Sequence, residues 1–105
     1  MAGNGKQTIG AVNAVKYSKN DFIEILHFLD TKGITITAPN PLPSRKAAEI
    51  GGKVLELIQK GNHSSLDIEV MRNYLNDNRA DIEKTSRLYY TIIDRTLTAL
   101  EGGGL

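Results

Sequence analysis

The chain has 105 residues, of which 40% are hydrophobic and 24% charged, and its 13 basic and 12 acidic side chains leave a formal charge of +1. This length allows a single domain with a modest core. The absence of cysteine excludes disulfide bonds, cysteine-ligated zinc and thiol chemistry. The nearly balanced charge argues against a protein that coats nucleic acid through bulk charge, and leaves room only for a local basic face.

The sequence contains neither a recognisable export signal nor an apolar run approaching the ~20 residues that span a bilayer. We therefore expect a cytoplasmic or virion-interior protein with no membrane partner. Residues 1–17 carry three glycines and few large apolar side chains. They are predicted to form a flexible N-terminal arm, and residues 18–105 a single helical domain.

The first two elements of that domain are a helix and an extended segment. Phe22, Ile25, Leu26 and Leu29 recur at helical spacing, and Gly33 is placed to end the helix. Residues 34–37 alternate isoleucine and threonine, which predicts a short strand or extended segment. Three prolines follow and exclude helix from the connection, namely Pro39, Pro41 and Pro43.

The second helix is predicted from its N-cap, Ser44, to about Lys60, where Gly61 ends it. Its buried face consists of Ala47, Ile50, Val54, Leu57 and Ile58. The pair Gly51-Gly52 lies inside this helix and costs about 1 kcal/mol per glycine relative to alanine. Close packing against another helix is the favoured explanation of this pair, and a bend is the alternative.

Two further helices are predicted in the last forty or so residues. Ser64 or Ser65 begins the third helix, and the turn residues 76–78 end it. Its apolar positions are Leu66, Val70, Met71, Tyr74 and Leu75. The fourth helix is predicted to run from about Arg79 to Leu100. One broad apolar stripe follows it, made of Ile82, Tyr89, Ile92, Ile93, Leu97 and Leu100.

The fourth predicted helix also carries the most informative polar pattern. Lys84, Arg87, Thr91 and Arg95 are three, four and four residues apart, so they share one face of a continuous helix. A helix with one packed face and one Arg/Lys/Thr face suits reading of the DNA major groove. Arg45 and Lys46 are placed to clamp the DNA backbone. The alternative is an ordinary solvated surface, neutralised by the nearby Glu83 and Asp94.

The second half of the chain resembles winged-helix DNA-binding domains of the ferric-uptake-regulator type. The resemblance covers residues 45–105 and rests on the segments 53–58 (KVLELI), 62–64 (NHS) and 93–101 (IDRTLTALE), followed by Gly104-Leu105. It implies that the last three helices form a helix-turn-helix with Arg95 on the recognition helix. Asp94 replaces the tyrosine that precedes this arginine in the family, the wing hairpin would follow Leu105, and none of the family's metal ligands is carried over.

These observations predict a mainly α domain of four helices, with a helix-turn-helix-like second half and one short extended segment. The predicted function is binding of double-stranded DNA as a homodimer, in regulation, partition or phage/plasmid control. The alternative is a helical interaction or assembly protein, such as an adaptor, an inhibitor or a subunit, in which Tyr89, Ile92, Leu97 and Leu100 pack against a partner helix.

Catalysis is not expected. The two histidines, His27 and His63, have no serine or aspartate arrangement beside them that suggests nucleophilic chemistry. The pair Glu24 and His27 supplies too few ligands for zinc. We predict neither a metal nor a cofactor.

Overall fold

A computed structural model describes residues 19–102, which form five α-helices and no β-strand. The helices are α2 (Asn20–Thr31), α3 (Arg45–Lys60), α4 (Ser65–Asp77), α5 (Arg79–Glu83) and α6 (Arg87–Glu101). The predicted mainly α class is therefore confirmed. The predicted N-terminal arm, residues 1–17, lies outside the described residues.

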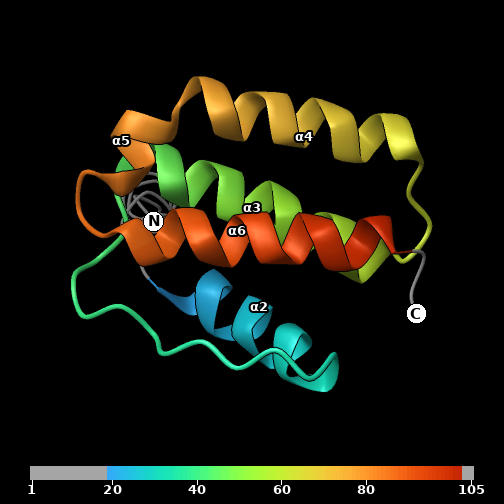
Figure 1. The fold of residues 1–105 in the computed structure, drawn as a ribbon, viewed down its shortest axis with the longest axis horizontal. Helices are drawn as coiled ribbons and strands as arrows, with labels where there is room; N and C mark the ends of the chain where they lie inside the picture. The colour runs from blue at the N-terminus through green and yellow to red at the C-terminus, as the bar shows by residue number, and fades with distance from the viewer. Residues whose placement is uncertain (1–18, 103–105) are drawn as a thin grey trace, which may run out of the picture.

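Helix α6 occupies the centre of the bundle. It contacts all four of the other described helices, with α4 on one side, α2 on the other and α3 behind it (Figure 1). Helices α2, α3 and α6 run in the same direction, and α4 runs opposite to them (Figure 1). The apolar stripe predicted for the last helix is buried completely, because it faces three neighbouring helices rather than one.

Side-chain caps and glycines set most of the helix ends. The Ser44 hydroxyl accepts from the Ala47 amide at 3.2 Å and begins α3. Ser64 and Asp67 form a reciprocal capping box at the start of α4, and Asp67 has a lowered pKa because its carboxylate accepts the Ser64 amide proton. Gly33 and Gly61 adopt positive φ angles of 81° and 69° directly after α2 and at the end of α3. All of these ends were predicted from the sequence.

The connection between α2 and α3 follows an extended path, as predicted, and forms no strand with any other part of residues 19–102 (Figure 1). Ile34 and Ile36 pack partly against the core. The Lys19 ammonium donates to the carbonyls of Pro39 and Asn40 at 2.7 and 2.8 Å. The Tyr89 hydroxyl donates to the Pro41 carbonyl, and burial raises the pKa of this phenol, so the group remains a neutral donor. Hydrogen bonds to the carbonyls of Pro39, Asn40 and Pro41 thus hold the connection against the bundle.

The predicted single helix from Arg79 to Leu100 is wrong, because the chain leaves the helix at residues 84–86. Ser86 adopts an extended conformation and its hydroxyl accepts from the Leu88 amide at 3.2 Å, which makes it the N-cap of α6. The short helix α5 packs on α3, where Asp81 accepts from the Ser44 hydroxyl at 2.9 Å. The four predicted helices therefore become five.

The apolar positions predicted for α4 are only partly correct. Met71 and Leu75 are buried, together with Ile68. Leu66 and Val70 instead face away from the core and are 64% and 54% exposed. Helix α4 thus has two apolar sides, of which one packs on the bundle and the other lies in solvent.

The glycine pair of α3 lies where α2 crosses it. A Cβ atom added at Gly51 would lie only 2.7 Å from Cζ and 2.8 Å from Cε2 of the buried Phe22 ring. A Cβ at Gly52 would meet only the Asp21 carboxylate, at 3.4 Å. Because α3 is continuous through both glycines, close packing is the correct explanation of the pair, and Gly51 carries it.

We expect Gly51→Ala and Gly52→Ala to change stability in opposite directions. Overpacking against Phe22 costs roughly 1–3 kcal/mol, which exceeds the ~1 kcal/mol that alanine gains in a helix. Gly52→Ala should keep most of that gain. Urea denaturation monitored by circular dichroism measures both free energies of unfolding. A Gly51→Ala variant as stable as Gly52→Ala would contradict the close contact.

Candidate functional site

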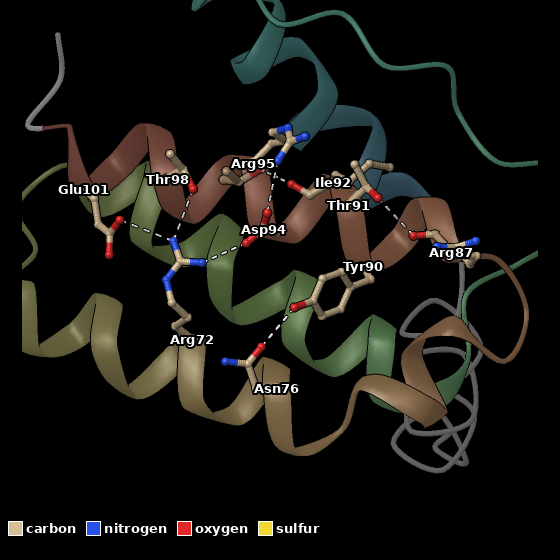
Figure 2. A network of polar contacts seen from close by, with 11 residues as sticks. Arg72, Asn76, Arg87, Tyr90, Thr91, Ile92, Asp94, Arg95, Thr98 and Glu101 are labelled. Carbon is tan, nitrogen blue, oxygen red and sulfur yellow. Dashed lines mark hydrogen bonds and ion pairs between the residues drawn. The ribbon is translucent and has the colours of Figure 1, made fainter.

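Three of the predicted DNA-contacting side chains follow one strip on α6. Arg87, Thr91 and Arg95 are four residues apart, on the opposite side from the buried Ile93 and Leu97. The Thr91 hydroxyl donates to the Arg87 carbonyl at 3.4 Å, and the Arg95 side chain is 54% exposed (Figure 2). The strip is open to solvent, as the sequence pattern predicted.

Lys84 does not belong to this strip. It follows the last residue of α5 and forms an exposed ion pair with Asp81 at 3.6 Å. Lys84 and Arg87 share a face only in one continuous helix, and the break at residues 84–86 removes that alignment. The pair Thr85-Ser86 was the sequence signal for this break, because serine favours N-cap positions over helix interiors.

An ion network on α6 offsets part of the strip's positive charge. Arg72 of α4 donates to Asp94 at 2.8 Å and contacts Thr98 and Glu101 at 3.3 and 3.4 Å (Figure 2). Asp94 also accepts from Arg95 at 3.2 Å. Arg95 lies on the α2 side of α6 and Asp94 on the α4 side (Figure 2). The polar face of α6 is therefore mixed in charge rather than uniformly basic.

Arg45 and Lys46, at the start of α3, both have a partner on the same helix. Their side chains lie 3.8 and 3.5 Å from the Glu49 carboxylate. The Lys46 ammonium also donates to the Tyr74 hydroxyl at 3.3 Å, and this hydrogen bond, followed by Glu49, raises its pKa. Both pairs are exposed enough to exchange with another anion at little cost.

The structure brings some of the predicted residues together and leaves one apart. Helices α3 and α6 begin at the same end of the bundle, where α5 also lies (Figure 1). Arg45, Lys84 and Arg87 are therefore at that end, whereas Arg95 is two turns along α6. Among residues 19–102, Arg87 forms no ion pair.

The charge of the described residues differs from that of the whole chain. Lys6 and Lys16 lie outside them, so residues 19–102 hold eleven basic and twelve acidic side chains, a formal charge of −1. Long-range electrostatic attraction to the phosphate backbone of nucleic acid is therefore weak for residues 19–102.

The outer face of α4 is a second candidate surface, and the sequence analysis missed it. Leu66 and Val70 are one turn apart and exposed, and the acidic side chains Asp67, Glu69 and Asp77 come from the same helix. Between residues 65 and 77 the sequence has one basic residue, Arg72, which is held by Asp94 of α6. The sequence signal for this exposed face was that Ile68, Met71 and Leu75 already form a complete apolar stripe at helical spacing. Leu66 and Val70 are not needed to complete that stripe.

Comparison with family models, curated proteins and solved structures found no match for this chain. In the part of the chain that the structure describes, no three histidine, aspartate or glutamate side chains gather as a metal ion requires. No helix among those residues has the length and apolar character needed to cross a bilayer.

We expect Arg72 to stabilise the packing of α4 on α6. Replacing Arg72 by Met should lower the free energy of unfolding by about 1 kcal/mol, since its pair with Asp94 is partly shielded from water. Arg45→Met is the matched control and should change stability by less than ~0.5 kcal/mol, because Arg45 is exposed. Thermal unfolding at low and high salt measures both, and equal losses for the two variants would contradict the role of Arg72.

Proposed function

We propose that this chain is a non-enzymatic helical interaction protein that binds a partner protein through the outer face of α4. The observation that carries the proposal is the exposure of Leu66 and Val70, at 64% and 54%, one turn apart on a well-formed helix. Burying a leucine or valine side chain contributes roughly 1.5–3 kcal/mol. Two such side chains on one face form the centre of a helix-in-groove or helix-on-helix contact.

The negative charge of α4 indicates the charge expected of its partner. Asp67 and Glu69 are sequence neighbours of the apolar pair and Asp77 ends the same helix, so a complementary segment presents apolar side chains flanked by lysine or arginine. Pairing of α4 with α4 of a second copy would bring like charges together. A basic amphipathic segment of another protein is therefore the occupant that we propose.

The side chains first expected to meet a partner helix are unsuited to that role. Tyr89, Ile92 and Leu97 are fully buried, and Leu100 nearly so, within this chain's own core. Exposing these core side chains would cost more free energy than burying them against a partner would regain. The alternative prediction of an assembly protein is kept, with α4 in place of α6 as its contact surface.

The test uses a synthetic helical peptide of leucine and lysine as the probe, with a leucine/glutamate peptide of the same pattern for comparison. We expect the basic peptide to bind and the acidic one not to bind, as measured by fluorescence anisotropy. The double variant Leu66→Gln/Val70→Gln should weaken binding about tenfold or more, because the apolar centre of the contact is lost.

Ile23→Gln/Leu42→Gln is the matched control, since both side chains are exposed and lie outside α4. It should leave peptide affinity unchanged, and size-exclusion mass measurement should give a monomer for every variant. Equal binding of both peptides, equal loss in the control, or an α4-dependent homodimer would each refute the proposed partner.

Duplex DNA binding by α6 is the second candidate, and the exposed strip Arg87, Thr91 and Arg95 supports it. Arg87 is at the end of the bundle where Arg45 and Lys84 also lie, and exposed ion pairs yield readily to phosphate. Helix α6 lies between α2 and α4. The strip therefore meets a DNA groove only when the whole length of α6 lies along that groove. The homodimer predicted for a DNA-binding regulator would present a second copy of the Arg87, Thr91 and Arg95 strip.

Under this candidate, affinity for random duplex DNA falls steeply with salt. Arg87→Ala and Arg95→Ala should each make the slope of log K against log salt shallower by about 1. Lys53→Ala, an exposed lysine on α3, is the control and should leave the slope unchanged. Absence of binding at low salt would eliminate the DNA candidate.

A further inference from the structure

Two adjoining hollows lie between the end of α2 and the last turns of α6. The larger, of ≈ 460 Å³, is formed where residues 31–34 approach α6. The smaller, of ≈ 340 Å³, is bounded by the segment 61–63 that follows α3. Lys32 and Ala99 line both, so the two hollows are neighbours, and we call them together the α2–α6 groove. Its volume is in the range of small-molecule sites.

The lining of the α2–α6 groove combines an apolar floor with a basic rim. Ile34, Phe28, Ile58, Ala99 and Leu100 provide the apolar side chains. Lys32 and Arg95 provide two cations, and Thr31 and Thr98 provide hydroxyls. In the described part of the chain, none of the residues lining either hollow is acidic. Apolar surface with a few convergent polar groups is typical of a site for an organic ligand.

The two cations are available to a ligand. The Lys32 ammonium lies 5.5 Å from the centre of the Phe28 ring and forms no ion pair among residues 19–102. Among residues 19–102, the one ion pair of Arg95 is with Asp94 at 3.2 Å, and Asp94 has a shorter contact with Arg72 at 2.8 Å. Arg95 can therefore turn to an anion in the groove while Asp94 stays paired.

The charges around the groove differ in how close they lie to it. Helices α2, α3 and α6 all end here, and each helix end carries about −0.5 of an elementary charge. Arg72 pairs with both Asp94 and Glu101, so its single charge offsets one of these two carboxylates, and Asp30 accepts from the Thr35 hydroxyl. None of these three acidic residues lines the hollows, whereas Lys32 and Arg95 do, so an anion in the groove meets the two cations directly.

We infer that the α2–α6 groove binds a small amphipathic anion, in which one carboxylate or similar group is attached to an aliphatic or aromatic body. The anionic group lies between Lys32 and Arg95, and the apolar body lies on Ile34 and Ala99. The inference does not rest on the proposed α4 interaction, because the two surfaces share no residue.

The test uses decanoate as the probe, with decanol and decyltrimethylammonium as neutral and cationic comparisons. We expect decanoate to shift the amide resonances of Ile34, Ala99 and Gly102 in ¹H–¹⁵N spectra of the intact chain, and the cation not to shift them. Lys32→Gln/Arg95→Gln should weaken decanoate binding about tenfold or more and leave the weaker binding of decanol unchanged.

Lys53→Gln/Arg45→Gln removes the same charge from α3, outside the groove, and is the matched control. It should retain decanoate affinity, which separates local contacts from the effect of net charge. No shift at millimolar decanoate, equal binding of the cationic probe, or full affinity in Lys32→Gln/Arg95→Gln would each overturn the inference. Circular dichroism of every variant confirms that the fold is intact.

Discussion

The close approach of α2 to α3 at Gly51 is the constraint on which the rest of the bundle depends. It allows the Phe22 ring to lie over the α3 backbone and to meet Tyr89 edge to face, with ring centroids 4.7 Å apart. Tyr89 in turn fixes the proline connection through the Pro41 carbonyl. One missing Cβ atom thereby sets the spacing of α2, α3 and α6, and with it the position of the end of α2 beside α6.

Features of the sequence that act locally predicted most of this fold. Ser44, Ser64 and Gly61 set helix ends through hydrogen bonds and backbone angles that involve only neighbouring residues, so a single sequence reveals them. The apolar stripe from Ile82 to Leu100 was also read correctly, because every one of its side chains is buried. The extended segment 34–37 followed from its β-branched residues and from the prolines behind it.

Features that depend on competition between distant contacts were not predictable in the same way. Ile82 and Tyr89 are seven residues apart, the spacing of one face of a continuous helix, yet packing of α5 on α3 and capping by Ser86 outweigh a few helical hydrogen bonds. Leu66 and Val70 have the same residue types and spacing as core positions. The spacing of Ile68, Met71 and Leu75 was a signal that this stripe suffices, and their burial against the bundle decides which side of α4 faces solvent. The candidate surfaces shifted accordingly, from one basic helix face to the outer face of α4 and to the α2–α6 groove.

The neighbouring residues Asp94 and Arg95 divide the polar face of α6 into two halves with different roles. Asp94 turns toward α4 and holds Arg72, which links the two helices (Figure 2). Arg95 turns toward α2 and borders the groove. An anion that engages Arg95 removes only the longer of the two contacts to Asp94, so the link between α4 and α6 stays in place. Neither Arg72 nor Asp94 lines the groove, so ligand binding there leaves the outer face of α4 free for a protein partner.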